Sequence, residues 1–328
     1  MAMVRHWRAA LGLALLLAAA AGLAPAQAQA QAPEVWLAPM DNVTHHGEDY
    51  PSMFADQAPW GGVSGRIAVF GMPIHHLLRM PPEQAIAQLQ WLRRHNIRLS
   101  LELPVLPVDK HQCGHGIEGM VWPGETRGAM QKLRALGAEP DYFGFDLPLT
   151  AAHLSKKPGA CHLPVAEVAA RLAQGIREIR EFYPHTRLTD EEVPTGIPHQ
   201  EWMALLSEWL TQVQQASGEQ FYAMVMDVWW PSDWHERVRQ SAQLLRSRGI
   251  RAGVFIDAVG HDDMPAGQWV ADARRNFCDL RRERAPVDFV VVANWMDSQV
   301  HNLPDRAPDS LTGLAGWILS GAPCGAGY

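Results

Sequence analysis

Carboxyl side chains stand at or near the ends of the apolar, β-rich runs of this 328-residue sequence. They are Asp41, Glu102, Asp146, Asp190, Glu191, Glu192, Asp227 and Asp257, and the last run ends in Asn294 and Trp295. A carboxyl group is costly to bury unless it is hydrogen-bonded or serves a function. Each one alone could equally cap the next helix or pair with an arginine, but together they predict one polar site.

Glycoside cleavage is the chemistry that such a set of carboxyls favours. It requires two of them facing the scissile bond, one protonated and one ionised. Glu192 is the preferred acid, because two acidic residues precede it and should raise its pKa. Asp146 or Asp227 would then be the nucleophile or the base that activates water, and Glu102 is a further catalytic candidate.

Tryptophans gather in the same segments and suit a sugar ligand. Indole faces stack against the C–H bonds of sugar rings, while carboxyls and amides bond to the hydroxyls. We therefore predict a substrate-binding group at the ends of the runs. Its members are Asp41, Trp229, Trp230, Asp257, Asn294 and Trp295.

Histidine pairs raise the alternative of metal-dependent hydrolysis. His45-His46 and His75-His76 follow the first two runs, but adjacent side chains point apart and no His-x-His motif follows the first run. No Gly-x-Ser-x-Gly turn is present. The sequence therefore predicts neither a metal site nor an organic cofactor.

The elements that must position these residues are eight strands, most of which precede a segment with helical periodicity. The predicted strands are 35–39, 66–71, 97–103, 142–147, 186–191, 221–228, 251–257 and 288–294. This alternation, without a break in composition, favours a single (β/α)8 TIM barrel over residues 33–328. An open doubly wound sheet is the alternative, but Met40-Asp41-Asn42-Val43 follows the first strand where a glycine-rich turn would be needed.

Two glycines fit the interior of such a barrel. Gly144 stands two residues before Asp146, and Gly253 stands four residues before Asp257. Side chains separated by an even number of residues share one face of a strand, so each glycine should face inward with its carboxyl. Inward side chains of neighbouring strands should then fill the space beside it.

Residues 1–32 are predicted to be a secretory signal peptide followed by an Ala/Gln/Pro linker. Arg5 and Arg8 precede an apolar stretch from Leu11 to Ala24, and cleavage is expected after about residue 28, 30 or 32. A membrane anchor is the alternative reading of this stretch. The mature chain is expected in the periplasm or outside the cell.

Four cysteines in an exported protein indicate two disulfides rather than a zinc site or reactive thiols. Of the three possible pairings we expect the most local, Cys113 with Cys161 and Cys278 with Cys324. The sequence has 35 acidic and 28 basic residues. This excess of acidic residues disfavours nucleic acid and anionic membranes as partners.

The chain resembles the (β/α)8 glycoside hydrolases, and more closely a little-characterised group of secreted bacterial proteins with that fold. Five segments carry the resemblance: CGHGIEG at 113–119, FDLPL at 145–149, DEE at 190–192, DVWW at 227–230 and NW at 294–295. The large retaining clan on this fold usually ends its fourth strand in Asn-Glu-Pro, with the Glu as acid/base, and its seventh in a nucleophilic Glu. Here Leu147 and Asp257 stand at those places, so that catalytic pair is not carried over.

The sequence therefore predicts a secreted glycoside hydrolase that acts on a poly- or oligosaccharide. The alternative from another class is a catalytically silent carbohydrate-binding barrel, accessory to exopolysaccharide export or remodelling. Leu147 favours this alternative, because leucine cannot carry a proton. Two carboxyls that face each other across a cavity would favour the hydrolase.

Overall fold

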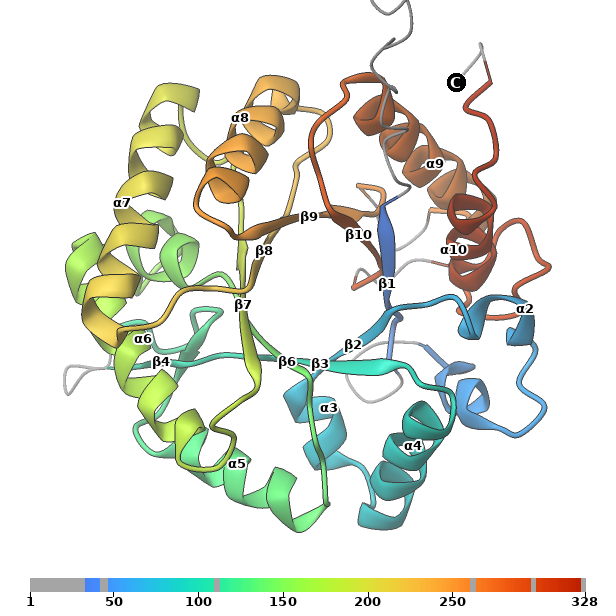
Figure 1. Ribbon diagram of the computed structural model, residues 1–328, viewed down its shortest axis with the longest axis horizontal. Helices are drawn as coiled ribbons and strands as arrows, with labels where there is room; N and C mark the ends of the chain where they lie inside the picture. Colours follow the sequence, from blue (N-terminus) through green and yellow to red (C-terminus); the bar gives the residue numbers. More distant parts are fainter. Residues whose placement is uncertain (1–32, 42–46, 109–112, 260–263, 296–298, 326–328) are drawn as a thin grey trace, which may run out of the picture. The chain divides into compact units, whose positions relative to one another are not determined.

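Eight parallel strands form a closed barrel in the computed structural model, which describes residues 33–41, 47–108, 113–259, 264–295 and 299–325 (Figure 1). In order around the barrel they are β1 (Glu34–Ala38), β2 (Val69–Pro73), β3 (Arg98–Leu103), β6 (Tyr142–Phe145), β7 (Arg187–Glu192), β8 (Ala223–Met226), β9 (Arg251–Ile256) and β10 (Phe289–Ala293). β10 pairs with β1 to close the ring. The predicted (β/α)8 TIM barrel is confirmed, and each predicted strand overlaps one of the eight.

Helices lie around the outside of the strand ring (Figure 1). They are α2 (Gly61–Ser64), α3 (Ile74–Arg79), α4 (Pro82–Arg94), α5 (Glu125–Ala135), α6 (Val165–Arg180), α7 (His199–Ser217), α8 (Trp234–Ser247), α9 (Ala266–Arg282) and α10 (Leu311–Leu319), with shorter turns η1 (Tyr50–Phe54) and η2 (Thr150–Leu154). Proline directly precedes α6, α7 and α9, where its fixed φ suits a helix start. Within the described ranges, no helix combines the length and apolar character needed to cross a bilayer.

The inside of the barrel has an apolar core separate from the one that packs the helices against it. Its buried members are Trp36, Val69, Tyr142, Ala223, Val225, Phe255, Phe289, Val291 and Ala293. At the start of β1, Glu34 pairs with Arg98 at 2.9 Å and with Arg251 at 3.4 Å. Aromatic packing and ion pairs therefore occupy the amino-terminal end of the barrel, and open space lies toward the carboxyl ends of the strands.

Both glycines predicted to face the barrel interior do so. A Cβ on Gly144 would lie 3.1 Å from Glu191 Oε1 and 3.3 Å from Thr189 Oγ1. A Cβ on Gly253 would lie 2.3 Å from Cζ of Phe289, far inside van der Waals contact. Side chains of neighbouring strands thus occupy the space beside each glycine, as the sequence indicated.

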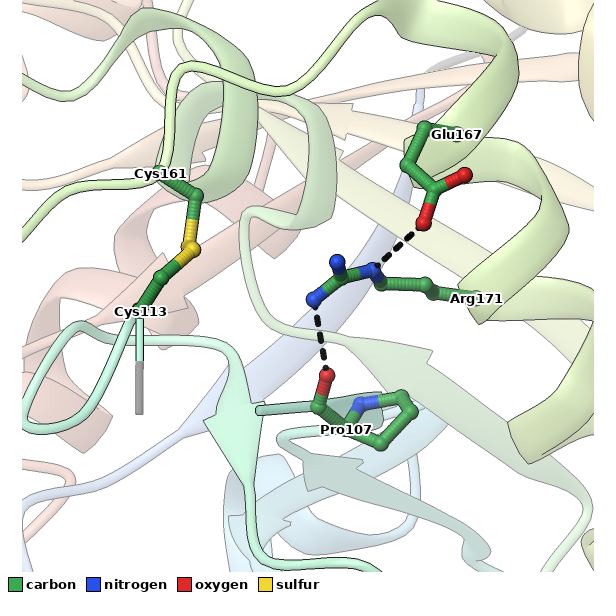
Figure 2. The surroundings of a disulfide bond; sticks show 5 residues. All are labelled: Pro107, Cys113, Cys161, Glu167 and Arg171. Atoms are coloured by element: carbon green, nitrogen blue, oxygen red, sulfur yellow. Dashed lines mark hydrogen bonds and ion pairs between the residues drawn. A yellow bond between two sulfur atoms is a disulfide. The ribbon is translucent and has the colours of Figure 1, made fainter. Parts of the chain in front are cut away.

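Both disulfides join the expected cysteines, Cys113 with Cys161 and Cys278 with Cys324. The first ties the segment between β4 (Leu106–Pro107) and β5 (Met120–Val121), a small separate two-stranded sheet, to the segment between η2 and α6. Figure 2 shows this bridge beside α6, where Arg171 donates to the carbonyl oxygen of Pro107 at 3.2 Å and pairs with Glu167. The loop between β3 and α5 is therefore held at two places.

Candidate active site

A cavity of about 380 Å³ opens at the carboxyl ends of the barrel strands. Six carboxyl side chains line it, together with the aromatic rings of Trp36, Phe255 and Trp295. The carboxyls belong to Asp41, Glu102, Glu118, Asp146, Glu191 and Asp227. The expected convergence of strand-end carboxyls on one cavity is therefore seen for five residues, Asp41, Glu102, Asp146, Glu191 and Asp227.

Four neighbouring strands supply the central carboxyls. Glu102 lies within β3 and Glu191 within β7, whereas Asp146 and Asp227 directly follow β6 and β8. The backbone N–H of Asp227 donates to the carbonyl oxygen of Glu192 at 2.9 Å, so the strand ladder continues to this residue. Their positions are therefore fixed by sheet hydrogen bonds rather than by a free loop.

The acidic run on β7 is divided between the two faces of the sheet. Glu191 lines the cavity, while Asp190 lies behind the strand and accepts a hydrogen bond from Nε1 of Trp209 on α7 at 2.8 Å. Burial, followed by the charge of Glu192, raises the pKa of Asp190 well above its usual range. The division follows from the period of two along a strand, which turns consecutive side chains to opposite faces.

Glu192, the acid preferred from the sequence, does not line the cavity and is fully buried. Its Oε1 accepts from the backbone N–H of Leu149 at 2.6 Å, and its Oε2 accepts from the N–H and the hydroxyl of Thr150 at 2.9 and 2.6 Å. Burial raises its pKa to about 8 against the opposing effect of these hydrogen bonds. The structure thus places Glu192 where it holds the segment after β6, and brings Glu191 to the cavity in its stead.

Burial is the main cause of raised pKa values in the cavity. It raises the pKa of Glu102 to about 8, with a further contribution from the charge of Asp146. Burial and the charge of Glu118 raise the pKa of Asp146 to about 7 and that of Asp227 to about 6. For Glu191, burial and the charge of Glu102 raise the pKa well above its usual range. The cavity can therefore hold protonated and ionised carboxyls together at neutral pH.

Glu118 is a cavity residue that strand-end reasoning missed. It belongs to the segment that the Cys113–Cys161 disulfide restrains, and its carboxylate lies 3.8 Å from Nζ of Lys157. The next residue, Gly119, has a φ of 76°, and a Cβ there would lie 2.4 Å from the carbonyl oxygen of Asp146. The available signal was the bridged cysteine five residues before Glu118, which fixes a loop near the barrel mouth.

The predicted substrate-binding residues fall into two groups. Asp41, Asn294 and Trp295 line the cavity, and Trp295 packs edge-on against Phe255 with ring centroids 5.0 Å apart. Asp257 and Trp230 do not line it; they are buried and bonded to each other, Nε1 of Trp230 donating to Oδ1 of Asp257 at 2.6 Å. Burial and the charge of Asp227 raise the pKa of Asp257 to about 7. Trp229 is exposed on the surface, with 56% of its area accessible.

Histidines occupy different places around the first two strands. His75 lines the cavity, whereas His76 is fully buried and its Nδ1 lies 3.2 Å from Oδ1 of Asp41. His45 and His46 lie outside the described residues. Among the residues that are described, no group of three or more His, Cys, Asp or Glu side chains is arranged to hold a metal ion.

Leu147, the residue after Asp146, also lines the cavity. Its φ is 46°, in the left-handed region that non-glycine residues seldom occupy. Such a conformation is retained when the surroundings enforce it, and it is frequent at ligand sites. The backbone after β6 thus turns sharply at the cavity wall.

Comparisons with known proteins support this fold. A mutant of xylanase 10C from Cellvibrio japonicus, in complex with xylopentaose, is similar over 90% of this chain and 69% of that chain, with a TM-score of 0.52 and 11% sequence identity. A thermostable mutant of the xylanase Xyn10A from the same organism is similar over 89% of this chain and 98% of that chain, with a TM-score of 0.52 and 10% identity. No family model matches the sequence, and no curated protein does. The likeness shows a (β/α)8 fold of the kind found in these glycoside hydrolases.

Proposed function

We propose that this protein is an exported glycoside hydrolase that cleaves a poly- or oligosaccharide with two cavity carboxyls and no cofactor. The observation that carries the proposal is the cavity itself, where carboxyls from four neighbouring strands meet between aromatic walls at the functional end of a TIM barrel. The similar solved structures are xylanases, one of them in complex with xylopentaose, which agrees with a glycan substrate.

Glu191 and Asp227 are the proposed catalytic pair. Burial and the surrounding carboxylates raise the pKa of Glu191 well above its usual range, which favours its protonated form, the form that can donate to the leaving oxygen. Asp227, whose pKa burial raises only to about 6, is ionised at pH 7 and can act as nucleophile or base. Asp146 and Asp227 add to this effect of burial when they are ionised.

Export is part of the proposal. Residues 1–32 are proposed to be a cleaved signal peptide and linker, and residues 33–328 the mature barrel domain. The two disulfides agree with an oxidising compartment such as the periplasm or the extracellular space.

A digestion screen with matched variants tests the proposal. The mature protein is incubated with xylan, galactan, β-glucans and chitosan, and new reducing ends are measured. Glu191→Gln and Asp227→Asn should each lower turnover by roughly 10²–10⁴-fold while leaving the fold intact. The control is Glu208→Gln, which makes the same chemical change on the exposed face of α7 and should retain full activity. Undiminished turnover in both cavity variants would refute the carboxyl-pair mechanism.

A catalytically silent carbohydrate-binding barrel is the second candidate, and Leu147 at the cavity wall favours it. An aliphatic side chain there removes the residue that the retaining clan uses as acid/base. Glycan binding by the wild-type protein without turnover on any substrate of the screen would select this candidate. Turnover that depends on Glu191 would exclude it.

A further inference from the structure

The cavity has far more acidic than basic groups. Among the described residues that line it, six are Asp or Glu, none is Lys or Arg, and the only histidine is His75. Basic groups outside the lining act on three of the six carboxyls: Asp41 lies near His76, Glu118 lies 3.8 Å from the exposed ammonium of Lys157, and the charge of Lys157 also acts on Asp146. The described part of the chain therefore places little positive charge in the interior of the site.

Three of the carboxyls also lack hydrogen-bond donors. Within the described part of the chain, no hydrogen bond or ion pair is made by the side chains of Glu102, Glu191 and Asp227. They are partly buried and face the cavity, and polar groups in such places are nearly always bonded to a partner. Hydrogen bonds to these three carboxyls must then come from water or from a ligand in the cavity.

The chemistry of the occupant follows from these two features. Glycoside cleavage needs only two carboxyls, so the further ones are surplus to the reaction. A neutral sugar would bring hydroxyl donors but no charge to offset the mutual repulsion of the carboxylates, and a uronic acid would add to that repulsion. A primary ammonium brings three N–H donors and a positive charge in one compact group.

We propose that the cavity takes an amino sugar with a free, protonated amino group, so that the substrate is a glucosamine-type oligo- or polysaccharide rather than a neutral or an anionic one. This inference rests on the proposed function for the cleavage step and on the charge of the cavity for the choice of substrate. The ammonium binds among Glu102, Asp146 and the acidic loop residue Glu118, while Glu191 and Asp227 remain for cleavage.

The titration of the site agrees with this assignment. Burial and the charges of Asp146 and Glu118 raise the pKa of Glu102, which means that the protein's own groups stabilise its ionised form poorly. A bound ammonium would stabilise that ionised form and so gain binding energy from Glu102. An N-acetylated sugar, whose amide is uncharged, would not.

Calorimetric titration of the mature protein with three tetrasaccharides tests the proposal. They are the tetramer of glucosamine, the tetramer of N-acetylglucosamine and the neutral cellotetraose, all at about pH 6, below the pKa of an ordinary amine. The glucosamine tetramer should bind at least about tenfold more tightly than either of the others, as expected for hydrogen bonds to a charged group. Added salt should weaken the binding of this ligand only, because screening acts on its charge.

A variant connects the preference to the cavity. Glu102→Gln keeps the shape of the side chain and removes the carboxyl that a bound ammonium would ionise, and should weaken glucosamine binding about fivefold or more without weakening the binding of the N-acetylated tetramer. Glu208→Gln, the exposed control on α7, should change neither. If Glu102→Gln does not fold, the salt dependence of the wild-type protein still decides the question.

The outcomes separate the two proposals. Equal or tighter binding of the uncharged tetramers would overturn the amino-sugar inference, and the hydrolase proposal would stand if those tetramers are cleaved. Preferential, salt-sensitive binding of the glucosamine tetramer without cleavage would support the inference and refute the hydrolase. Preferential binding with cleavage that Glu191→Gln abolishes would support both.

Discussion

Replacing Gly253 by alanine should destabilise the barrel, although alanine normally favours a strand interior over glycine by about 0.5–1 kcal/mol. The new Cβ would lie 2.3 Å from Cζ and 2.4 Å from Cε2 of Phe289 on the neighbouring strand β10. A normal contact requires the ring to move by more than about 1 Å. Phe289 cannot give way easily, because it is fully buried and stacks on Trp36 with ring centroids 4.3 Å apart.

We expect a net loss of about 1–3 kcal/mol in the free energy of unfolding, as for other overpacked cores. Urea unfolding followed by tryptophan fluorescence measures it, with an unchanged m-value as the sign that only stability has altered. Gly253→Ala combined with Phe289→Leu should recover part of the loss, because leucine leaves room for the added methyl group. Wild-type or higher stability of Gly253→Ala alone would show that the assigned register between β9 and β10 is wrong.

Gly144→Ala provides the contrast within the same barrel. Its Cβ would lie 3.1 Å from Oε1 of Glu191, the mobile end of a side chain that can move by a few tenths of an ångström. Stability should therefore change by less than about 1 kcal/mol. Turnover should fall, since the displaced group is the proposed acid.

Three further predictions concern groups around the cavity. Glu192→Gln should cost about 1–3 kcal/mol of stability, because an amide cannot accept all three hydrogen bonds that the carboxyl accepts; thermal unfolding checks this, and turnover of the folded fraction should be unchanged. Stability should fall as the pH rises from about 4 to 8, because the unfolded chain then loses carboxyl protons that the folded chain retains through its raised pKa values. A loss of about 2 kcal/mol in the free energy of unfolding would lower Tm by roughly 4–8 °C. A higher Tm at pH 8 than at pH 5 would contradict the raised pKa values. Replacing Cys113 and Cys161 by serine should cost up to about 4 kcal/mol of stability and also lower turnover. The same change at Cys278 and Cys324, which close a loop of similar length away from the cavity lining, should reduce stability alone.

The strands and their acidic ends could be predicted because both follow from local sequence patterns. Apolar runs followed by a helical period fix the order of the elements, and the carboxyl ends of parallel strands must share one rim. Asp146 and Asp227 were therefore found by position alone, and both line the cavity.

The choice within the acidic run on β7 could not be made in the same way. Consecutive residues face opposite sides of a strand, so selecting Glu191 over Glu192 requires the register of β7 against β6, where Thr189 pairs with Gly144. A large apolar residue within the run would have indicated which alternate positions face away from the cavity. Three acidic residues in succession give no such indication.

Two other features arise only from tertiary contacts. Asp257 ends its strand as predicted, yet the indole of Trp230 bonds to it and covers it. Glu118 reaches the cavity from a loop without periodicity, and its place depends on a bridge between residues 48 positions apart. In both cases the partner lies far away in the sequence, so no local pattern indicates the contact.

The bridge between Cys113 and Cys161 also bears on the order in which the fold and the site form. One wall of the cavity, the segment with Glu118, is tied by a covalent bond that forms only under oxidising conditions. A chain that completes its barrel before oxidation would have this wall untethered, and Glu118 would not yet be held beside the carboxyls that the strands position. The binding site would then be completed only after the barrel has folded and the bridge has formed.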